Sequence, residues 1–349
     1  MRRSKNGEIQ VSLALEQRWF HTRGMAILLP FASGKGGVGK TVLAANVAYA
    51  LARRGKTVVL VDLDWGGSNA HTVLGVLNSH LGLGDYLLDP EKRLQDLVLP
   101  LDVPGLSLIP GDGLVAGAAN LPFVRKRRLL RELPELDADY VLLDLGAGSH
   151  GQTVDFFLAS ALGFVVTVAE PTAILNAFSF LKTALFRAMY QVTPARSPAR
   201  GALKEFFTSH QTSRADLDET IEWIRQEEPK VADKLVLTRS RLRPLVILNM
   251  GRETADLTQG AHLRRLCERQ LGVGIEYVAL TPWDPAVHKS VVDRRLLARE
   301  APKSPLSLAV DVLARRIVER GFPGEAPLGT FDDLEDLADE FPLPAKGKN

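Results

Sequence analysis

The string GKGGVGKT, Gly34 to Thr41, constrains this chain more than any other feature of its sequence. It lies between an apolar run, Ala26 to Ala32, and an alanine-rich helical pattern, Thr41 to Arg54. A glycine-rich turn between a strand and a helix lets successive backbone N–H groups point at bound phosphates. The string therefore predicts a phosphate-binding loop for ATP or GTP inside a strand–loop–helix unit.

Two lysines in this loop have different expected positions. Lys40 can reach the outer phosphates of a nucleotide, and the hydroxyl of Thr41 can bind Mg²⁺. Lys35 comes too early in the loop to duplicate Lys40, so we expect it to point outward, toward phosphates held by another subunit. A solvated lysine in an exposed loop is the alternative. The other residues expected to line the nucleotide phosphates are Gly34, Gly36, Gly37, Val38, Gly39 and Val42.

Short β-rich runs alternate with helical patterns along the chain. This alternation predicts an α/β fold with a mainly parallel sheet flanked by helices on both faces. Pro30 lies inside the first run, where it removes a ladder donor, and we expect a local bulge there. The predicted strands are Ala26 to Ala32, Thr57 to Val61, Leu106 to Ile109, Tyr140 to Leu143, Phe164 to Val168, Leu245 to Leu248 and Ile275 to Ala279.

Several polar residues follow these strands. Ligands of such sheets bind beyond the carboxyl ends of the strands, where the phosphate loop, Asp62, Asp144 and Asn249 are all expected. Asp62 and Asp64 alternate across a strand end, so only one of them can face a metal ion and the other must point elsewhere or lie beyond the strand. Asp144 could instead cap a loop, and the two earlier aspartates could form a solvated acidic turn.

These motifs resemble those of a known family. GKGGVGKT, with its extra Lys35, resembles the deviant Walker A motif of the MinD/ParA class of P-loop ATPases. DLDWGGSN, which begins at Asp62, is similar to the switch I segment of that family, and YVLLDLGAG, which begins at Tyr140, is similar to its Walker B strand and switch II. The resemblance covers about Ala26 to Gly321, and it is strongest to the FlhG-like subgroup, the MinD-like regulators of flagellar placement.

The resemblance implies a role for each matching residue. Lys35 would cross a dimer interface to the nucleotide of the partner subunit, and Asp144 would hold Mg²⁺ through water. Asp62 would support the water shell of the metal ion, and Asp64 would position the attacking water. On the base side, the matching residues are Asn249, which would read the adenine edge, and Pro282 and Asp284, which would close over the base. Strand-end turns are the alternative for these last three residues.

The implied function is a slow, partner-stimulated ATPase whose ATP-bound homodimer positions a cellular structure, such as the flagellum. One alternative is a partition ATPase that binds nonspecific DNA through basic residues, namely Arg264, Arg265, Arg269, Lys289, Arg294 and Arg295. Another is a metabolic enzyme or cluster carrier on the same fold. Cys267 is the one cysteine of the chain, so the cysteine pair of a cluster carrier is missing. A protein that binds ATP without turnover is a third alternative, against which Asp64 argues.

Composition and patterning divide the chain of 349 residues. Residues 25–321 are expected to form the ATPase domain, with a helical insertion at about 190–243 that builds a small subdomain beside the nucleotide site. Residues 1–24 form a basic extension, which could be disordered or dock elsewhere. Residues 322–349 form an acidic tail, whose charge has the wrong sign for anionic lipid. The net charge of +2 argues neither for a polyanion partner nor against local basic patches. Because the chain has no apolar run of membrane-spanning length, we expect a cytoplasmic protein, which could lie at the periphery of the membrane or nucleoid.

Overall fold

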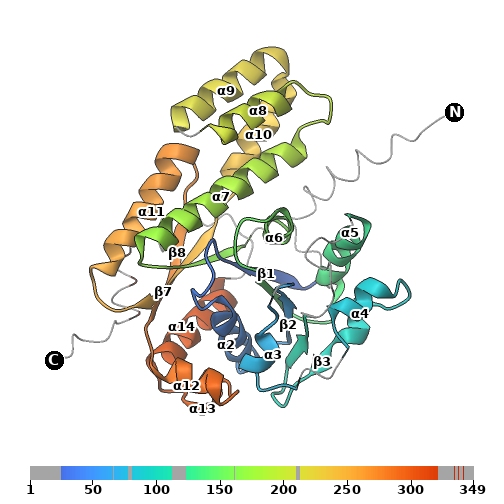
Figure 1. Ribbon diagram of the computed structural model, residues 1–349, viewed down its shortest axis with the longest axis vertical. Coiled ribbons are helices and arrows are strands. Elements are labelled where there is room, and N and C mark those ends of the chain that lie inside the picture. Colours follow the sequence, from blue (N-terminus) through green and yellow to red (C-terminus); the bar gives the residue numbers. More distant parts are fainter. Residues whose placement is uncertain are drawn as a thin grey trace.

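The structure is a computed structural model that describes residues 25–65, 67–77, 81–111, 123–160, 162–209 and 213–320, together with Leu334, Leu337 and Phe341. The expectations for residues 1–24 and for the rest of the tail lie outside the described residues. An eight-stranded sheet in the order β3-β4-β2-β5-β1-β6-β7-β8 forms the centre of the molecule (Figure 1). All neighbouring strands run parallel except β3 and β4.

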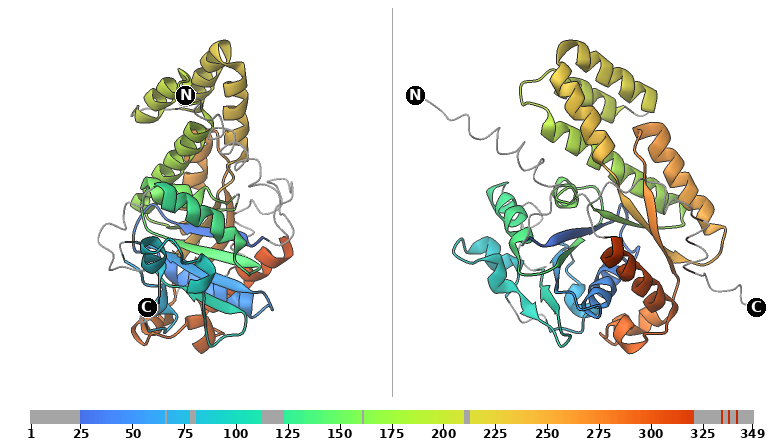
Figure 2. Two further views of the ribbon diagram at one scale, coloured as in Figure 1. Left: turned by 90° about the vertical axis from the view of Figure 1, so that its right-hand side faces the viewer. Right: turned by 180° about the vertical axis from the view of Figure 1, so that it is seen from behind.

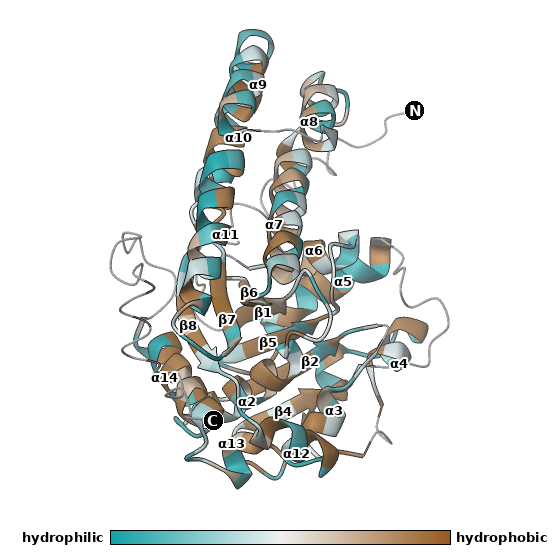
Figure 3. Ribbon diagram, turned by 60° about the vertical axis from the view of Figure 1, so that its left-hand side comes forward, coloured by the Kyte–Doolittle hydropathy of each residue, from teal (hydrophilic) through white to brown (hydrophobic). Residues whose placement is uncertain are grey.

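The strands are buried because helices cover both faces of the sheet. Strands β2 and β5 are buried along their entire lengths, and their near-continuous apolar sequences are typical of parallel strands covered on both sides (Figure 3). The strands are β1 (Ile27–Ala32), β2 (Val58–Leu63), β3 (Leu99–Pro100), β4 (Leu106–Ile109), β5 (Tyr140–Leu145), β6 (Phe164–Val168), β7 (Leu245–Gly251) and β8 (Glu276–Pro282). The seven predicted strands are confirmed, and the two-residue edge strand β3 was not predicted.

Helices α2 and α14 lie on one face of the sheet, and α6, α7 and α11 lie on the other (Figures 1 and 2). The longer helices are α2 (Lys40–Ala52), α5 (Phe123–Glu132), α7 (Pro171–Val192), α8 (Ala199–Thr208), α9 (Arg214–Glu227), α10 (Pro229–Arg241), α11 (Asp256–Leu271) and α14 (Pro305–Arg320). The shorter ones are α3 (Ala70–Val73), α4 (Leu83–Leu88), η1 (Leu94–Leu97), η2 (Leu133–Glu135), α6 (Gly151–Phe157), α12 (Ala286–Val292) and α13 (Leu297–Glu300).

Pro30 lies in the middle of β1, opposite Leu143 of β5, and the pairing passes through it without a register shift. The expected bulge is therefore wrong. The N–H of Ile27 donates to the carbonyl of Asp139, and since successive residues of a strand face opposite sides, the nitrogen of Pro30 faces β6. Strand β6 pairs with β1 only from Phe31 onward. Pro30 thus removes no ladder hydrogen bond.

The segment expected to form a helical insertion contains helices α8, α9 and α10. We expected this segment to lie beside the phosphate loop, and this expectation is wrong. Helix α7 begins next to that loop and its 22 residues span about 33 Å, so the three helices stand at the opposite edge of the sheet (Figures 1 and 2). The reason is that α10 must lead into β7, which begins at the amino-terminal edge shared by all the parallel strands.

The described tail residues pack against the domain. Leu334, Leu337 and Phe341 are buried, and the guanidinium of Arg316 lies 5.0 Å from the centre of the Phe341 ring. A Cβ atom on Gly260 would lie 3.3 Å from Leu334, so the absence of a side chain there makes room for the tail. In the part of the chain that the structure describes, no helix is long and apolar enough to cross a membrane.

Candidate functional site

The phosphate loop connects β1 to α2 and takes a shape that only glycine accepts at three positions. Gly37 and Gly39 have φ angles of +79° and +82°, in the left-handed region that side chains disfavour. A Cβ atom on Gly34 would lie 2.1 Å from the carbonyl oxygen of Asn176 in α7. The loop is therefore pressed against α7 on one side and turns directly into the N-terminus of α2, where backbone N–H groups favour an anion.

Lys40 and Asp144 form a buried ion pair at the base of this loop. The Lys40 Nζ atom lies 2.5 Å from Asp144 Oδ1, and the two side chains are only 7% and 1% exposed. The second oxygen of Asp144, Oδ2, has no hydrogen-bond partner among the described residues. A buried carboxylate oxygen without a partner beside a glycine loop fits a site for Mg²⁺ and phosphate, with the half-buried Thr41 one residue along α2.

Asp62 lies opposite Asp144 in the pairing of β2 with β5. Burial and the neighbouring charge of Asp144 raise the pKa of Asp62 to about 6, although hydrogen bonds oppose this shift. Its carboxylate accepts from the Ser68 hydroxyl at 2.7 Å and from the N–H groups of Ala70 at 3.0 Å and Asp64 at 3.1 Å. Asp62 thereby holds the segment that follows β2 against the sheet edge.

Asp64 lies just beyond the end of β2, as one of the two expected arrangements requires. A Cβ atom on Gly146 would lie 3.2 Å from Asp64 Oδ1, so the turns after β2 and β5 approach each other closely. Gly146 permits this approach because it has no side chain. The position of a water molecule relative to Asp64 stays a prediction.

Lys35 points out of the loop toward the start of α7. Its Nζ atom lies 2.8 Å from Glu170 Oε2 and 3.3 Å from Thr172 Oγ1. The lysine side chain is 39% exposed and the glutamate side chain 60%, so this ion pair is at the surface. Glu170 and Thr172 belong to the sequence EPT, whose contact with Lys35 no local motif predicts.

Asn249, near the end of β7, uses both ends of its amide within the protein. Its Nδ2 atom donates to the carbonyl of Val38 at 2.7 Å, and its Oδ1 accepts from Thr281 Oγ1 at 2.6 Å. The next residue, Met250, has φ +57°, a strained value for a residue other than glycine. This backbone conformation coincides with a register irregularity between β7 and β8. Contact of Asn249 with an adenine edge stays a prediction.

Pro282 ends β8 and leads into an exposed tryptophan. Asp284 is 6% exposed, and its carboxylate accepts from the N–H groups of Ala286 at 2.9 Å and Leu306 at 3.1 Å. It therefore holds the starts of α12 and α14 together. Trp283 is 44% exposed, with the guanidinium of Arg252 at 4.9 Å from its ring centre. Thr281 and Trp283 were not predicted as site residues, although they lie on either side of Pro282 in the sequence.

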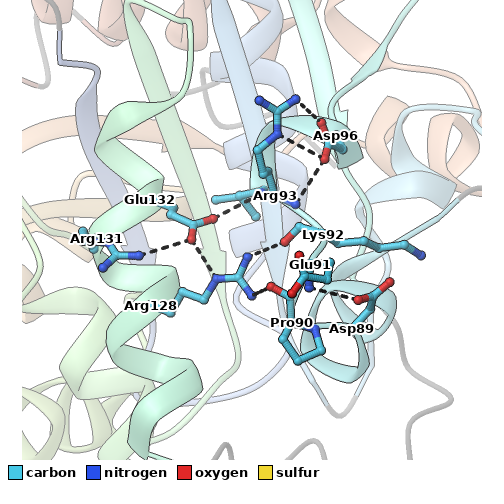
Figure 4. A network of polar contacts seen from close by, with 10 residues as sticks. Asp89, Pro90, Glu91, Lys92, Arg93, Asp96, Arg128, Arg131 and Glu132 are labelled. Atoms are coloured by element: carbon cyan, nitrogen blue, oxygen red, sulfur yellow. Dashed lines mark hydrogen bonds and ion pairs between the residues drawn. The ribbon is translucent and has the colours of Figure 1, made fainter.

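Helix α5 carries a run of basic residues, and some of them bind other residues of the domain. Arg128 donates to the carbonyls of Pro90 and Lys92 and to the carboxylate of Glu132 (Figure 4). Lys126 pairs with the buried Asp155. In α11, Arg264 lies over the ring of Tyr277 at 5.4 Å. The use of this and the other selected arginines in DNA binding stays a prediction.

Among the described residues, no group of three or more His, Cys, Asp or Glu side chains could hold a metal ion.

Residues 29–297 match the family described as the CobQ/CobB/MinD/ParA nucleotide binding domain. The chain belongs to this family. Flagellum site-determining protein YlxH of Helicobacter pylori is 35% identical to it over 171 residues, which are 47% of this chain and 55% of YlxH. Antiactivator FleN of Pseudomonas aeruginosa is 25% identical over 287 residues, which are 81% of this chain and 83% of FleN. The chain thus spans little more than half the length of YlxH and most of FleN.

Solved structures of this family share the fold. The septum site-determining protein MinD of Pyrococcus horikoshii OT3, complexed with Mg-ADP, has a TM-score of 0.59 at 21% identity and covers 86% of this chain and 100% of its own. A MinC:MinD cell division protein complex of Aquifex aeolicus has a TM-score of 0.54 at 20% identity, with coverage of 86% and 99%. The predicted α/β fold of the MinD/ParA type is confirmed.

Proposed function

We propose that the protein is an ATPase that binds Mg-ATP at the Gly34 to Thr41 loop and acts as an ATP-dependent dimerisation switch in the positioning of flagella. One observation carries the proposal: the two lysines of the loop lie in different surroundings. Lys40 is buried on Asp144, inside the nucleotide cradle, whereas Lys35 is exposed at its edge. An exposed cation at that edge suits the phosphates of a nucleotide in a facing molecule.

The proposed roles follow from placement. Lys40 and the loop N–H groups bind the phosphates, while Thr41 and Asp144 would hold Mg²⁺ and Asp62 would support that site. Magnesium, when bound, neutralises phosphate charge. Asp64, beyond the strand end, orients the attacking water. Two observations support the binding of Mg²⁺ and phosphate here: the Oδ2 atom of Asp144 has no hydrogen-bond partner among the described residues, and the Gly34 to Thr41 loop has a shape that requires glycine.

The positioning role is supported by the flagellar relatives. FleN, called an antiactivator, matches most of this chain, and YlxH, called a flagellum site-determining protein, matches a shorter part of it at higher identity. We therefore propose a homodimer that engages a partner protein, stays dimeric while ATP is bound, and separates after hydrolysis. The same proposal places the protein in the cytoplasm, with contact to the membrane or nucleoid only peripheral.

Size-exclusion chromatography with light scattering tests the switch on the wild type, Lys35→Ala and Asp64→Ala, each with and without Mg-ATP. We expect the wild type to dimerise transiently, Asp64→Ala to stay dimeric with ATP, and Lys35→Ala to stay monomeric. Isothermal titration calorimetry separates the steps, since Lys35→Ala should still bind ATP. Identical elution of all three proteins under both conditions would exclude the dimerisation switch, and absence of ATP binding by the wild type would exclude the whole proposal.

A further inference from the structure

A groove of about 340 Å³ lies between α8 and α9, in the inserted helices and away from the nucleotide site. Its lining includes two aromatic side chains, Phe206 and Trp223, and two acidic ones, Glu205 and Asp216. Trp223 is 47% exposed, although an indole on a helix surface exposes a large apolar area to water. Tryptophans in such positions are enriched at the centres of binding surfaces. The groove is therefore a candidate docking surface.

The charge around this groove favours a basic occupant. Helix α9 carries five acidic residues and two arginines. One arginine, Arg225, pairs with Glu222 and Asp233, and the other, Arg214, pairs with Asp218. Glu205 makes no ion pair within the described part of the chain, and its side chain lines the groove. A segment that fits the groove should combine bulky apolar side chains with lysine or arginine.

Residues 1–24 of this chain have that composition. They contain five Arg or Lys residues and two Glu residues, and thus carry a net charge of +3 with histidine neutral. Four aliphatic side chains alternate with small or polar ones from Ile9 to Leu15, in the sequence IQVSLAL. In an extended segment such alternation places the aliphatic side chains on one side. Three of the cations, Arg2, Arg3 and Lys5, come before this apolar stretch.

The segment joins the domain at the same edge of the sheet as the inserted helices. It ends at Met25, just before β1, at the amino-terminal edge of the parallel sheet. The inserted helices stand beyond the same edge, because α10 leads into the start of β7. Met25 follows Leu15 by ten positions, and an extended chain of that length spans up to about 35 Å. Helix α9, with 14 residues, is about 21 Å long.

We propose that residues 1–24 dock in the α8–α9 groove of their own molecule. The aliphatic side chains between Ile9 and Leu15 contact Phe206 and Trp223, and the preceding cations face Glu205. The docked segment covers an apolar surface that the domain otherwise exposes to water. This docking does not depend on the nucleotide site.

Hydrogen exchange of the full-length chain tests the docking. We compare the wild type with a variant in which Ile9, Val11, Leu13 and Leu15 are all replaced by serine, so that chain length and charge are unchanged. We expect amides of residues 199–227 to exchange at least fivefold faster in the serine variant. Addition of a synthetic peptide of residues 1–24 should restore the protection. Equal exchange in the two proteins would overturn the proposal.

Groove variants identify the contact. A fluorescent peptide of residues 1–24 is titrated onto the serine variant carrying Trp223→Gln, Glu205→Arg or Leu237→Gln. We expect the first two changes to weaken peptide binding at least tenfold. Leu237 is 45% exposed on α10 outside the groove, so its change should leave binding unaltered and controls for exposed apolar area. Asp216 is left intact because it accepts the N–H of Ser213 at the start of α9.

Two outcomes of this titration count against the docking. Equal binding to the Trp223→Gln protein and to its parent would place the contact elsewhere. Binding of the peptide to vesicles of anionic lipid, with none to the protein, would assign the segment to a membrane surface instead.

Discussion

The side-chain amide of Asn249 donates a hydrogen bond to the backbone carbonyl of Val38, 2.7 Å away, and so ties the end of β7 to the phosphate loop. Thr281 donates to the other end of the amide and thereby sets its orientation. These two contacts connect three segments that are far apart in the sequence. The loop is therefore held from the side by β7 and β8 as well as by its own glycines.

The hydrogen bond from Asn249 to Val38 acts as a tether of the loop, and it predicts the effect of Asn249→Ala on nucleotide binding. Loss of the bond to Val38 leaves a buried carbonyl without its donor, at a cost of about 1–3 kcal/mol, so we expect the affinity for Mg-ATP to fall about 5- to 150-fold. Isothermal titration calorimetry measures the change. Thr281→Val keeps the tether and should have a smaller effect. An unchanged affinity of the Asn249→Ala protein would show that the loop does not need the tether.

The Lys35–Glu170 pair predicts that Glu170→Gln favours the ATP-dependent dimer. In the single chain Glu170 holds Lys35 to its own molecule, and the substitution releases the lysine for a facing subunit. Because both side chains are well exposed, each pair contributes about 1 kcal/mol at most, and a symmetric dimer contains two such lysines, so we expect dimer association to rise no more than about 30-fold. Analytical ultracentrifugation in the Asp64→Ala background checks this, with Glu222→Gln on α9 as the control. A weaker dimer would indicate that Glu170 itself contacts the partner.

Two glycine substitutions are expected to have opposite effects on stability. A Cβ atom on Gly39 would lie 2.5 Å from Asn249 Nδ2, and its φ is already +82°, so Gly39→Ala should destabilise the domain by about 1–3 kcal/mol and impair ATP binding. Among the described residues, a Cβ atom on Gly201 in α8 would meet nothing within 4 Å beyond its chain neighbours and its own helix backbone. Gly201→Ala should therefore stabilise the domain by about 0.5 kcal/mol. Urea denaturation measures both changes. Equal effects of the two substitutions would contradict this account of the loop.

Asp155 predicts a pH-dependent contribution to stability. Burial raises its pKa, but hydrogen bonds and charges from Arg187 and Lys126 outweigh burial, so the net pKa lies below the ordinary value. A carboxylate with a lowered pKa in the folded state stabilises the protein above its unfolded-state pKa of about 3.9 and loses this effect as the pH falls.

We therefore expect Asp155→Asn to lower the free energy of unfolding by about 2–3 kcal/mol at pH 7, with the difference shrinking as the pH falls through the unfolded-state pKa of about 3.9 and below it. Urea denaturation of both proteins at several pH values provides the measurement. Asp233→Asn, which affects a largely exposed partner of Arg225, should change stability little at any pH. A difference between wild type and Asp155→Asn that stays constant from pH 7 to pH 3 would rule out the titration of Asp155 as its cause.

Local patterns sufficed to predict the strands and the sheet edge that gathers the candidate site. Apolar runs such as those of β2 and β5 define buried parallel strands, and the aspartates next to their carboxyl ends then meet at one edge because parallel strands share a direction. The two wrong expectations, a bulge at Pro30 and an insertion beside the phosphate loop, concern features that depend on neighbouring elements of the fold. Pro30 is accepted in β1 because β6 starts late, and the inserted helices stand away from the loop because α7 is long.

The sequence by itself determined that this protein has a glycine-shaped phosphate loop, a parallel α/β sheet and aspartates at its carboxyl edge, because these depend on backbone preferences and hydrophobic periodicity within short segments. Only the tertiary structure decided that Lys35 lies on Glu170, 135 positions away, and that Asn249 holds Val38, 211 positions away. Such pairs follow from how helices and strands pack in space, and no local spacing of residues encodes them.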